Sequence, residues 1–268
     1  MRTPPRRIRS RLEGGQPVLG ATLQMPSPET VEIAGYTGMD YVWIDAEHGT
    51  MDLRDIAEMV RAADGCGIDA IIRIPDHNPS YIQRVLDLGA AGIIAPHVCD
   101  ADQARGLVAA AKYAPEGTRG ACPQTRAVGH VSTDWSADSR RSNADVLVFA
   151  MIEDFDGVEN VESISQSGVD GLLFGSFDLS QSLGLDGSVD HIDLERMQNR
   201  VTSAVRSSGI EYITLGWDFD DFATICTYSR IFNVAADRPG LFNLFSSAIT
   251  NKLAEIEKSG ATYQLQRS

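Results

Sequence analysis

The feature that most constrains this chain is a regular alternation of short apolar runs with amphipathic stretches. There are eight such runs, and most of them are almost continuously apolar instead of alternating, which is typical of strands buried on both faces of a parallel sheet. The eight runs are Val18–Leu23, Tyr41–Ile44, Ala70–Ile74, Gly92–Ala95, Val146–Ile152, Gly171–Phe174, Tyr212–Leu215 and Ile231–Ala235. The stretches between them carry apolar residues at helical spacing, and Leu241–Lys258 is predicted to be a long final helix. Strands that alternate with helices in this way predict a parallel α/β fold.

A closed (β/α)8 TIM barrel is favoured over an open sheet, and we expect one barrel domain over residues 1–268. A barrel of this type needs about 250 residues. The GxGxxG and GxxxxGK[ST] motifs that open many nucleotide-binding sheets are missing. Polar residues instead follow the C-terminal ends of many strands, where the active sites of barrels assemble. They are Asp45, Glu47, His48, Arg73, His97, Glu153, Asp154, Asp178, Trp217, Asp218 and Asp237.

Composition excludes several classes of partner. The formal net charge is −14, which argues against a nucleic acid and against an anionic membrane surface. No apolar run is long enough to span a bilayer. The basic N-terminus lacks the apolar stretch of a signal peptide, and the four cysteines have no metal-binding spacing. We therefore expect a cytoplasmic protein that acts on small molecules.

The segment Asp45-Ala-Glu-His48 places three ionisable groups directly after the second predicted strand. An aspartate beside an imidazole can fix its tautomer and hold it as a general base. The alternative is a capped turn that leads into the next helix.

Arg73 lies at the end of a predicted strand, and Glu153 and Asp178 come after the ends of two others. A buried arginine needs an anion, and this anion is either a substrate oxygen or a carboxylate of the rim. Two carboxylates on neighbouring strands can bind one hard divalent cation and leave positions open for substrate. The alternative for the two acids is helix capping or salt bridging.

The remaining histidines and the lysines are less informative. His77, His97, His130 and His191 are isolated in the sequence, and structural or solvated roles are favoured for each. The alternative is a contact with substrate by His97, on the rim after Pro96, or by His130, in the longest connection. The three lysines, Lys112, Lys252 and Lys258, do not follow a strand. A Schiff-base aldolase needs a desolvated lysine in its site, so an aldolase built on this chain would need a metal.

The longest connection, Tyr113–Asp145, is predicted to be a lid or an oligomer contact with a short helix near Ala137–Ala144. Connections of this length within a compact domain are usually functional or mobile.

An ordered set of motifs resembles the HpcH/HpaI aldolase family of metal-dependent class II pyruvate aldolases. The motifs are Ile44-Asp-Ala-Glu-His-Gly49, Arg73 with Pro75, Leu86-Asp-x-Gly-Ala-x-Gly92, Lys112-Tyr-x-Pro-x-Gly-x-Arg-Gly120, Ile152-Glu153, Gly168-Val-Asp-Gly171 and Gly175-x-x-Asp178-Leu-Ser180. Together they extend from about Leu19 to about Asp237.

The resemblance implies a carbon–carbon lyase that reversibly cleaves a 4-hydroxy-2-oxo acid to pyruvate and an aldehyde through a metal-stabilised enolate. It implies that a divalent metal (Mg2+ or Mn2+/Co2+) is held by Glu153 and Asp178. Arg73 would stabilise the enolate oxygen, and His48, oriented by Asp45, would act as base through water.

The resemblance also has implications for substrate binding and assembly. Backbone amides near Ser176–Asp178 would bind the substrate carboxylate, and the substrate-binding residues would be Gly175, Ser176, Phe177, Met151 and Thr22. Asp87 would support the site of a neighbouring subunit, and Glu47 is grouped with it as a supporting residue. The final helix would be exchanged between subunits of a homo-oligomer, namely a hexamer arranged as a trimer of dimers.

Three positions depart from the family pattern and leave the substrate open. Met151 replaces a usual glutamine, Ser176 a usual proline and Thr22 a common tryptophan. Oxaloacetate decarboxylation, cleavage of another 2-oxo acid or acyl-CoA, and a bond-forming biosynthetic step remain alternatives that use the same enolate. A non-catalytic barrel is disfavoured, because packing alone does not require the five polar residues Asp45, His48, Arg73, Glu153 and Asp178.

Overall fold

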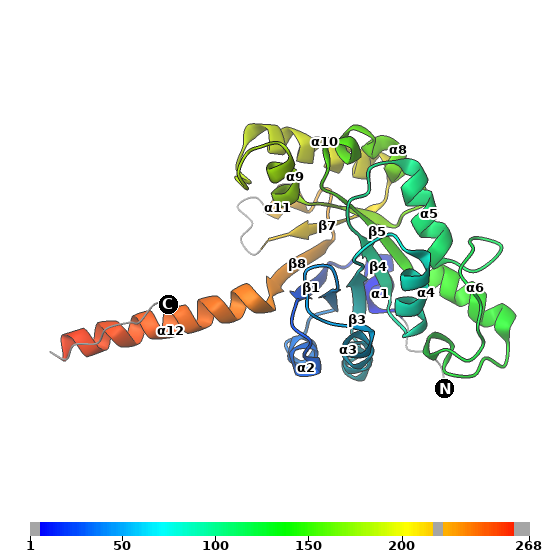
Figure 1. Cartoon of the computed structure of the whole chain (residues 1–268), viewed down its shortest axis with the longest axis horizontal. Helices are drawn as coiled ribbons and strands as arrows, with labels where there is room; N and C mark the ends of the chain where they lie inside the picture. The colour runs from blue at the N-terminus through cyan, green and yellow to red at the C-terminus, as the bar shows by residue number, and fades with distance from the viewer. Residues whose placement is uncertain (1–5, 217–221, 260–268) are drawn as a thin grey trace.

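The structure is a computed structural model that describes residues 6–216 and 222–259. Eight parallel strands pair in chain order, and β8 pairs with β1 to close a barrel that is surrounded by helices (Figure 1). The strands are β1 Val18–Leu23, β2 Tyr41–Asp45, β3 Asp69–Arg73, β4 Gly92–Ala95, β5 Leu147–Ile152, β6 Gly171–Phe174, β7 Glu211–Leu215 and β8 Ile231–Ala236. All eight predicted strands are confirmed, with boundaries that differ by one residue at most.

The helices follow the strands in the order expected for a (β/α)8 barrel. They are α1 Arg7–Glu13, α2 Pro28–Tyr36, α3 Leu53–Cys66, α4 Pro79–Asp87, α5 Ala101–Ala111, η1 Arg126–Val128, α6 Trp135–Asp145, α7 Phe155–Glu159, α8 Val161–Ser165, α9 Ser176–Ser182, α10 Ile192–Ser208, α11 Phe222–Ile225 and α12 Asp237–Lys258. Several begin at a side chain that accepts backbone N–H groups, such as Asp52 before α3 and Asp100 before α5. These caps fix where each helix leaves the rim.

The strands separate two apolar cores because successive side chains point to opposite faces. Val42, Ile44 and Ile72 pack outward against the helices. Tyr41, Trp43, Ile71, Phe149 and Met151 belong to a second cluster that fills the barrel. The side chains two residues further along β2, β3 and β5 therefore lie above the barrel core, at the rim.

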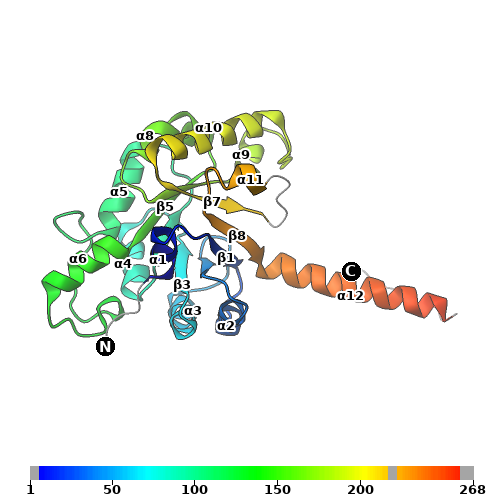
Figure 2. The same cartoon turned by 180° about the vertical axis from the view of Figure 1, so that it is seen from behind.

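Helix α1 closes the end of the barrel opposite this rim, and in Figure 2 it lies in front of the strands. Ile8 is fully buried in the barrel cluster, and its N–H donates to Asp69 Oδ2 at 2.8 Å. The basic N-terminal segment thus forms a structural plug from residue 7 onward.

The long connection between α5 and β5 also lies at the end opposite the rim. Arg126 donates to the carbonyl of Leu88 at 3.1 Å and pairs with Asp64, near the C-terminal ends of α4 and α3. The predicted helix in this connection is confirmed as α6, Trp135–Asp145. The connection therefore does not form a lid over this chain's own rim, because in this topology an α-to-β connection returns to the opposite end of the barrel. The alternative interpretation, an oligomer contact, stays a prediction.

Helix α12 projects away from the barrel (Figure 1). Its side chains Phe242, Leu244 and Phe245 are 60–72% exposed, and Asp237 at its start is its single buried residue among those described. Within the described ranges, no helix combines the length and the apolar character needed to cross a membrane.

Candidate functional site

The inward-facing positions at the ends of β2, β3 and β5 bring three of the predicted site residues together. Asp45 ends β2, Arg73 ends β3, and Glu153 directly follows β5. Asp45 is fully buried, Glu153 is 2% exposed, and Arg73 is 8% exposed. The barrel therefore concentrates ionised groups on an apolar floor, where their interactions are strong.

Arg73 is held by a two-pronged ion pair with Asp45. Its Nε donates to Asp45 Oδ1 at 2.8 Å and its Nη2 to Asp45 Oδ2 at 2.6 Å. Its Nη1 lies 3.0 Å from Glu47 Oε2, and its guanidinium lies 5.2 Å from the centre of the Trp43 ring. Burial alone would raise the pKa of Asp45, but the hydrogen bonds and charge of Arg73 outweigh it and lower that pKa. The rim salt bridge, one of the two expectations for Arg73, is present, and it fixes the direction in which Nη1 points.

Asp45 positions the turn that carries His48, but not in the expected way. Its Oδ1 accepts the backbone N–H groups of Glu47 and His48, both at 3.2 Å, and its Oδ2 accepts Gln24 Nε2 at 2.8 Å. With these bonds and Arg73, the carboxylate is fully engaged. Among the described contacts none joins it to the imidazole, whose Nε2 instead lies 3.8 Å from Glu47 Oε2. The expected Asp45–imidazole pair is therefore corrected to a backbone-held turn with a half-exposed His48 ring.

Glu153 is a buried carboxylate in an acidic surrounding. Its Oε1 accepts the backbone N–H of His97 at 2.8 Å. Burial, with the charges of Glu47 and Asp178, raises its pKa to about 7 against the opposing effect of His97. A Cβ on Gly175 would lie 2.6 Å from Glu153 Oε2. Glycine at this position therefore makes room for the carboxylate.

The Gly175-x-x-Asp178 segment forms the start of α9, with Gly175 as N-cap. Asp178 lies in the first turn and is close enough to Glu153 for its charge to raise the pKa of that residue. Phe177 is 59% exposed, and Ser176 is the first helical residue. The N–H groups of a first helical turn lack partners within the helix, and in α9 this turn directly follows Gly175, which lies against Glu153.

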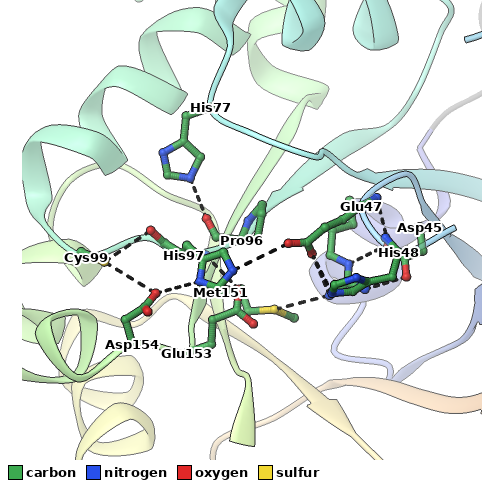
Figure 3. Close-up of polar contacts among 11 residues, drawn as sticks. Asp45, Glu47, His48, His77, Pro96, His97, Cys99, Met151, Glu153 and Asp154 are labelled. Carbon is green, nitrogen blue, oxygen red and sulfur yellow. Dashed lines mark hydrogen bonds and ion pairs between the residues drawn. The ribbon is translucent and has the colours of Figure 1, made fainter. Parts of the chain in front are cut away.

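His97 belongs to the site, although the sequence interpretation took it as structural or solvated. Its backbone has φ +53°, its ring Nδ1 lies 2.9 Å from Asp154 Oδ2, and its Nε2 lies 3.8 Å from Glu47 Oε1. Figure 3 shows the ring between Asp154 and Glu47. Burial would lower the pKa of His97, but the hydrogen bond to Asp154 and the neighbouring acids raise it. The signal in the sequence was its place after Pro96 at a strand end.

Like Ser176 in the first turn of α9, the other two positions that depart from the family pattern lie at the site or beside it. Met151 is 2% exposed, and its sulfur lies 4.0 Å from Arg73 Nη1 (Figure 3). A thioether is a weaker acceptor than an amide oxygen, so Nη1 keeps donor capacity. Thr22 is half-buried on β1, and its hydroxyl accepts Asn233 Nδ2 at 2.9 Å.

Two other predictions lie away from the described site. Asp87, at the end of α4, pairs with Arg119 Nη2 at 2.6 Å, and its role beside a second subunit stays a prediction. Trp217 and Asp218, which were predicted to lie on the rim, are outside the described residues.

The residues present fit a hard divalent cation bound by few protein ligands. In the described part of the chain no three His, Cys, Asp or Glu side chains converge on one point. Glu153 and Asp178 are nevertheless close enough to interact, and the raised pKa of Glu153 reflects an excess of negative charge in a buried place. Carboxylate oxygens are the donors that magnesium and manganese prefer, and magnesium is commonly bound through one or two of them.

Comparison with known proteins decides the family. A family model described as HpcH/HpaI aldolase/citrate lyase matches residues 22–232. The chain belongs to this family. A 5-keto-4-deoxy-D-glucarate aldolase of Klebsiella pneumoniae is 30% identical over 206 residues, which cover 76% of this chain and 80% of that protein.

Two further proteins are similar to this chain over much of their length. A 2-dehydro-3,6-dideoxy-6-sulfogluconate aldolase of Pseudomonas putida is 35% identical over 67% of this chain and 70% of its own. The crystal structure of citrate synthase SbnG superposes with a TM-score of 0.86 at 28% identity and covers 93% of this chain and 98% of that one. Because relatives of this family are named aldolases, the chain is a carbon–carbon lyase.

Proposed function

We propose that this HpcH/HpaI protein cleaves a 4-hydroxy-2-oxo acid reversibly to pyruvate and an aldehyde, with a divalent metal as cofactor. The observation that carries the proposal is the meeting of Arg73, buried Glu153 and Asp178 on one rim, with His48 at its exposed edge. The named activities of the Klebsiella and Pseudomonas relatives support this reaction.

The two carboxylates bind the cofactor, and the first turn of α9 orients the substrate. Glu153 and Asp178 would hold the cation, which supplies Lewis-acid stabilisation for the negative charge that develops on the 2-oxo oxygen. Backbone N–H groups of Ser176 and Phe177 would bind the substrate carboxylate at the start of α9. Both interactions place the 2-oxo oxygen beside Arg73.

Arg73 and His48 act on opposite ends of the bond that breaks. Arg73 Nη1, already fixed by Glu47, donates to the 2-oxo oxygen as it becomes an enolate oxygen. His48 removes the proton of the 4-hydroxyl group through a water molecule. The C3–C4 bond then breaks, its electron pair forms the enolate, and C4 leaves as an aldehyde. Protonation of C3 gives pyruvate.

Solvent deuterium exchange into the methyl group of pyruvate, followed by NMR, tests this proposal. We expect exchange with Mg2+ or Mn2+, none in EDTA, and none in Glu153→Gln with either metal. Glu159→Gln, on the exposed side of α7, is the matched control and should exchange like the parent. Undiminished exchange in EDTA would refute the metal, and no exchange with any metal would refute pyruvate as the substrate.

The likeness to citrate synthase SbnG favours a second candidate, in which the site forms a carbon–carbon bond. Here the bound 2-oxo acid would be oxaloacetate, and its C2 carbonyl would accept the enolate of a second substrate, an acyl thioester, to give a tertiary alcohol. Metal-dependent consumption of oxaloacetate that requires the acyl thioester, without any exchange into pyruvate, would favour this reaction over aldol cleavage, whereas consumption without the thioester would favour a decarboxylation.

We also propose that the protein is a homo-oligomer in which α12 packs on another copy of the chain. The exposed side chains Leu241, Phe242, Leu244, Phe245 and Ile249 support this proposal. A helix that is apolar where it is exposed needs a partner to bury that surface. Exchange of this helix in a hexamer, as the resemblance implies, would provide the partner.

A further inference from the structure

Arg238 is a rim arginine for which the proposed reaction has no use. It follows Asp237 at the start of α12, and its side chain is exposed. Its Nη1 donates to the carbonyl of His48 at 3.4 Å, and its Nη2 donates to the carbonyl of Gln24 at 3.2 Å. Within the described residues it forms no ion pair, whereas the other rim arginine, Arg73, pairs with two carboxylates.

The backbone that carries Arg238 is firmly held. Asp237 is 8% exposed, and its Oδ2 accepts the N–H groups of Gln24 and Met25, both at 2.9 Å. Its Oδ1 accepts the N–H of Arg238 at 2.7 Å. The start of α12 is thereby tied to the loop after β1, so the guanidinium is placed before any ligand arrives, which lowers the cost of binding.

Arg238 lies where one part of the substrate, the aldehyde half, would extend. Arg73 and Glu153 lie at the buried bottom of the site, where the 2-oxo acid half would bind. His48, the proposed base for the 4-hydroxyl, is 55% exposed at its edge. Atoms beyond C4 must therefore extend outward past His48, where the guanidinium of Arg238 donates to the His48 carbonyl. Two carbonyl bonds use two of its five N–H groups, so three remain for a ligand.

The acidic surroundings of Arg238 indicate which chemical group it binds. Glu47, Glu153, Asp154 and Asp178 all lie near the rim, and the chain carries a net charge of −14. An anionic tail would be repelled by these acids unless a cation received it. We propose that Arg238 binds a negatively charged group at the far end of the aldehyde half, such as a carboxylate or a phosphate. This inference rests on the proposed aldol reaction and adds the class of its aldehyde.

The experiment compares aldehydes in the addition direction, with pyruvate and Mg2+ or Mn2+. Succinic semialdehyde carries a carboxylate, glyceraldehyde 3-phosphate carries a phosphate, and propanal and glyceraldehyde are neutral. We expect the parent to prefer one of the anionic aldehydes. Arg238→Gln should lower kcat/KM for that aldehyde by about tenfold or more, as for loss of one charge-assisted hydrogen bond, and change the neutral aldehydes by less than about twofold. Arg238→Lys should recover part of the loss.

Arg105→Gln is the matched control, because Arg105 is an exposed arginine on the outer helix α5. It should leave all four aldehydes unchanged. Equal losses for charged and neutral aldehydes in Arg238→Gln would show that Arg238 only supports the His48 turn and would overturn the inference. No loss for any aldehyde would overturn it as well.

Pyruvate methyl exchange separates this inference from the function on which it rests. Exchange needs no aldehyde, so Arg238→Gln should exchange at the parental rate. If the parent and Arg238→Gln both exchange, but the parent shows no preference for anionic over neutral aldehydes, only the role of Arg238 is refuted. Absence of exchange in the parent refutes the aldol proposal, and the inference falls with it.

Discussion

Glu153 occupies a place where its negative charge is unfavourable without a cation. It is 2% exposed, and burial together with Glu47 and Asp178 raises its pKa to about 7. An unfolded glutamate has a pKa of about 4.3. Between these two values the folded protein binds more protons than the unfolded chain, so folding stability must fall as pH rises.

The first prediction concerns Glu153→Gln in EDTA. The Tm of the parent, relative to this variant, should decrease as pH rises from about 4.3 to about 7 and should stay constant above that. Thermal unfolding followed by circular dichroism at several pH values measures this difference. Addition of Mn2+ at pH 8 should raise the Tm of the parent and not that of the variant. A difference in Tm that is independent of pH would contradict the buried-carboxylate interpretation.

The second prediction concerns the buried pair of Arg73 and Asp45. Arg73→Met leaves a fully buried carboxylate without its partner, and loss of one member of a buried pair typically costs about 3–5 kcal/mol. The variant Arg73→Met/Asp45→Leu removes both charges and should recover part of this loss. Urea unfolding measures both, with Arg105→Met as a control that changes stability by less than about 0.5 kcal/mol. Additive losses in the double variant would show that the two residues are not energetically coupled.

At the scale of elements, the strands could be predicted because a barrel strand is buried on both faces. Each strand therefore appears in the sequence as a mostly apolar run, such as Gly171–Phe174. The geometry of the barrel sets the length of that run. The same logic identified Asp45, Arg73 and Glu153, since a polar residue that ends such a run must lie at the rim. Helix ends were less well predicted, because the amphipathic stretch between β5 and β6 divides into two short helices, α7 and α8.

The rest of the site depends on geometry that a linear pattern does not encode. His97 joins the site through a backbone with positive φ and through contacts with Glu153 and Asp154, which lie more than 50 positions away. Arg238 reaches His48 from the opposite end of the chain. The sequence predicted that Asp45 would position His48, and its carboxylate does accept the His48 backbone N–H. The sequence did not predict that Asp45 is the carboxylate that pairs with Arg73, because Arg73 is distant in the sequence.

The third prediction concerns the turn after β4, which presents the His97 N–H to Glu153. Glycine adopts positive φ freely, whereas a β-branched residue is strained there. His97→Gly should therefore keep Mn2+ binding, measured by electron paramagnetic resonance, and His97→Val should weaken it by about tenfold or more, as expected for about 1–3 kcal/mol of backbone strain. Ser80→Val, at an exposed position of α4, is the control and should bind like the parent. Equal binding by both His97 variants would show that the turn does not position Glu153.

At the scale of the whole molecule, the described chain exposes several large apolar side chains. Phe242, Leu244 and Phe245 are exposed on a helix that leaves the barrel (Figure 2). The barrel also exposes Ile33 and Tyr36 on α2, at 62% and 85%. Contiguous exposed apolar side chains of this kind mark protein interfaces.

The fourth prediction is that Phe242→Ser/Phe245→Ser dissociates the oligomer. Burial of one phenylalanine contributes about 1.5–3 kcal/mol, so two substitutions in every copy should weaken each contact severely. Size-exclusion chromatography with light scattering should give a multiple of 29.0 kDa for the parent and a smaller species for the variant. Circular dichroism should show that the barrel persists, since these side chains add nothing to its two cores. Asn251→Ser, on an exposed position of the same helix, should assemble like the parent. If the mass of the parent in solution equals that of one chain, the oligomer is refuted. If the variant has the same mass as an oligomeric parent, another surface holds the copies together.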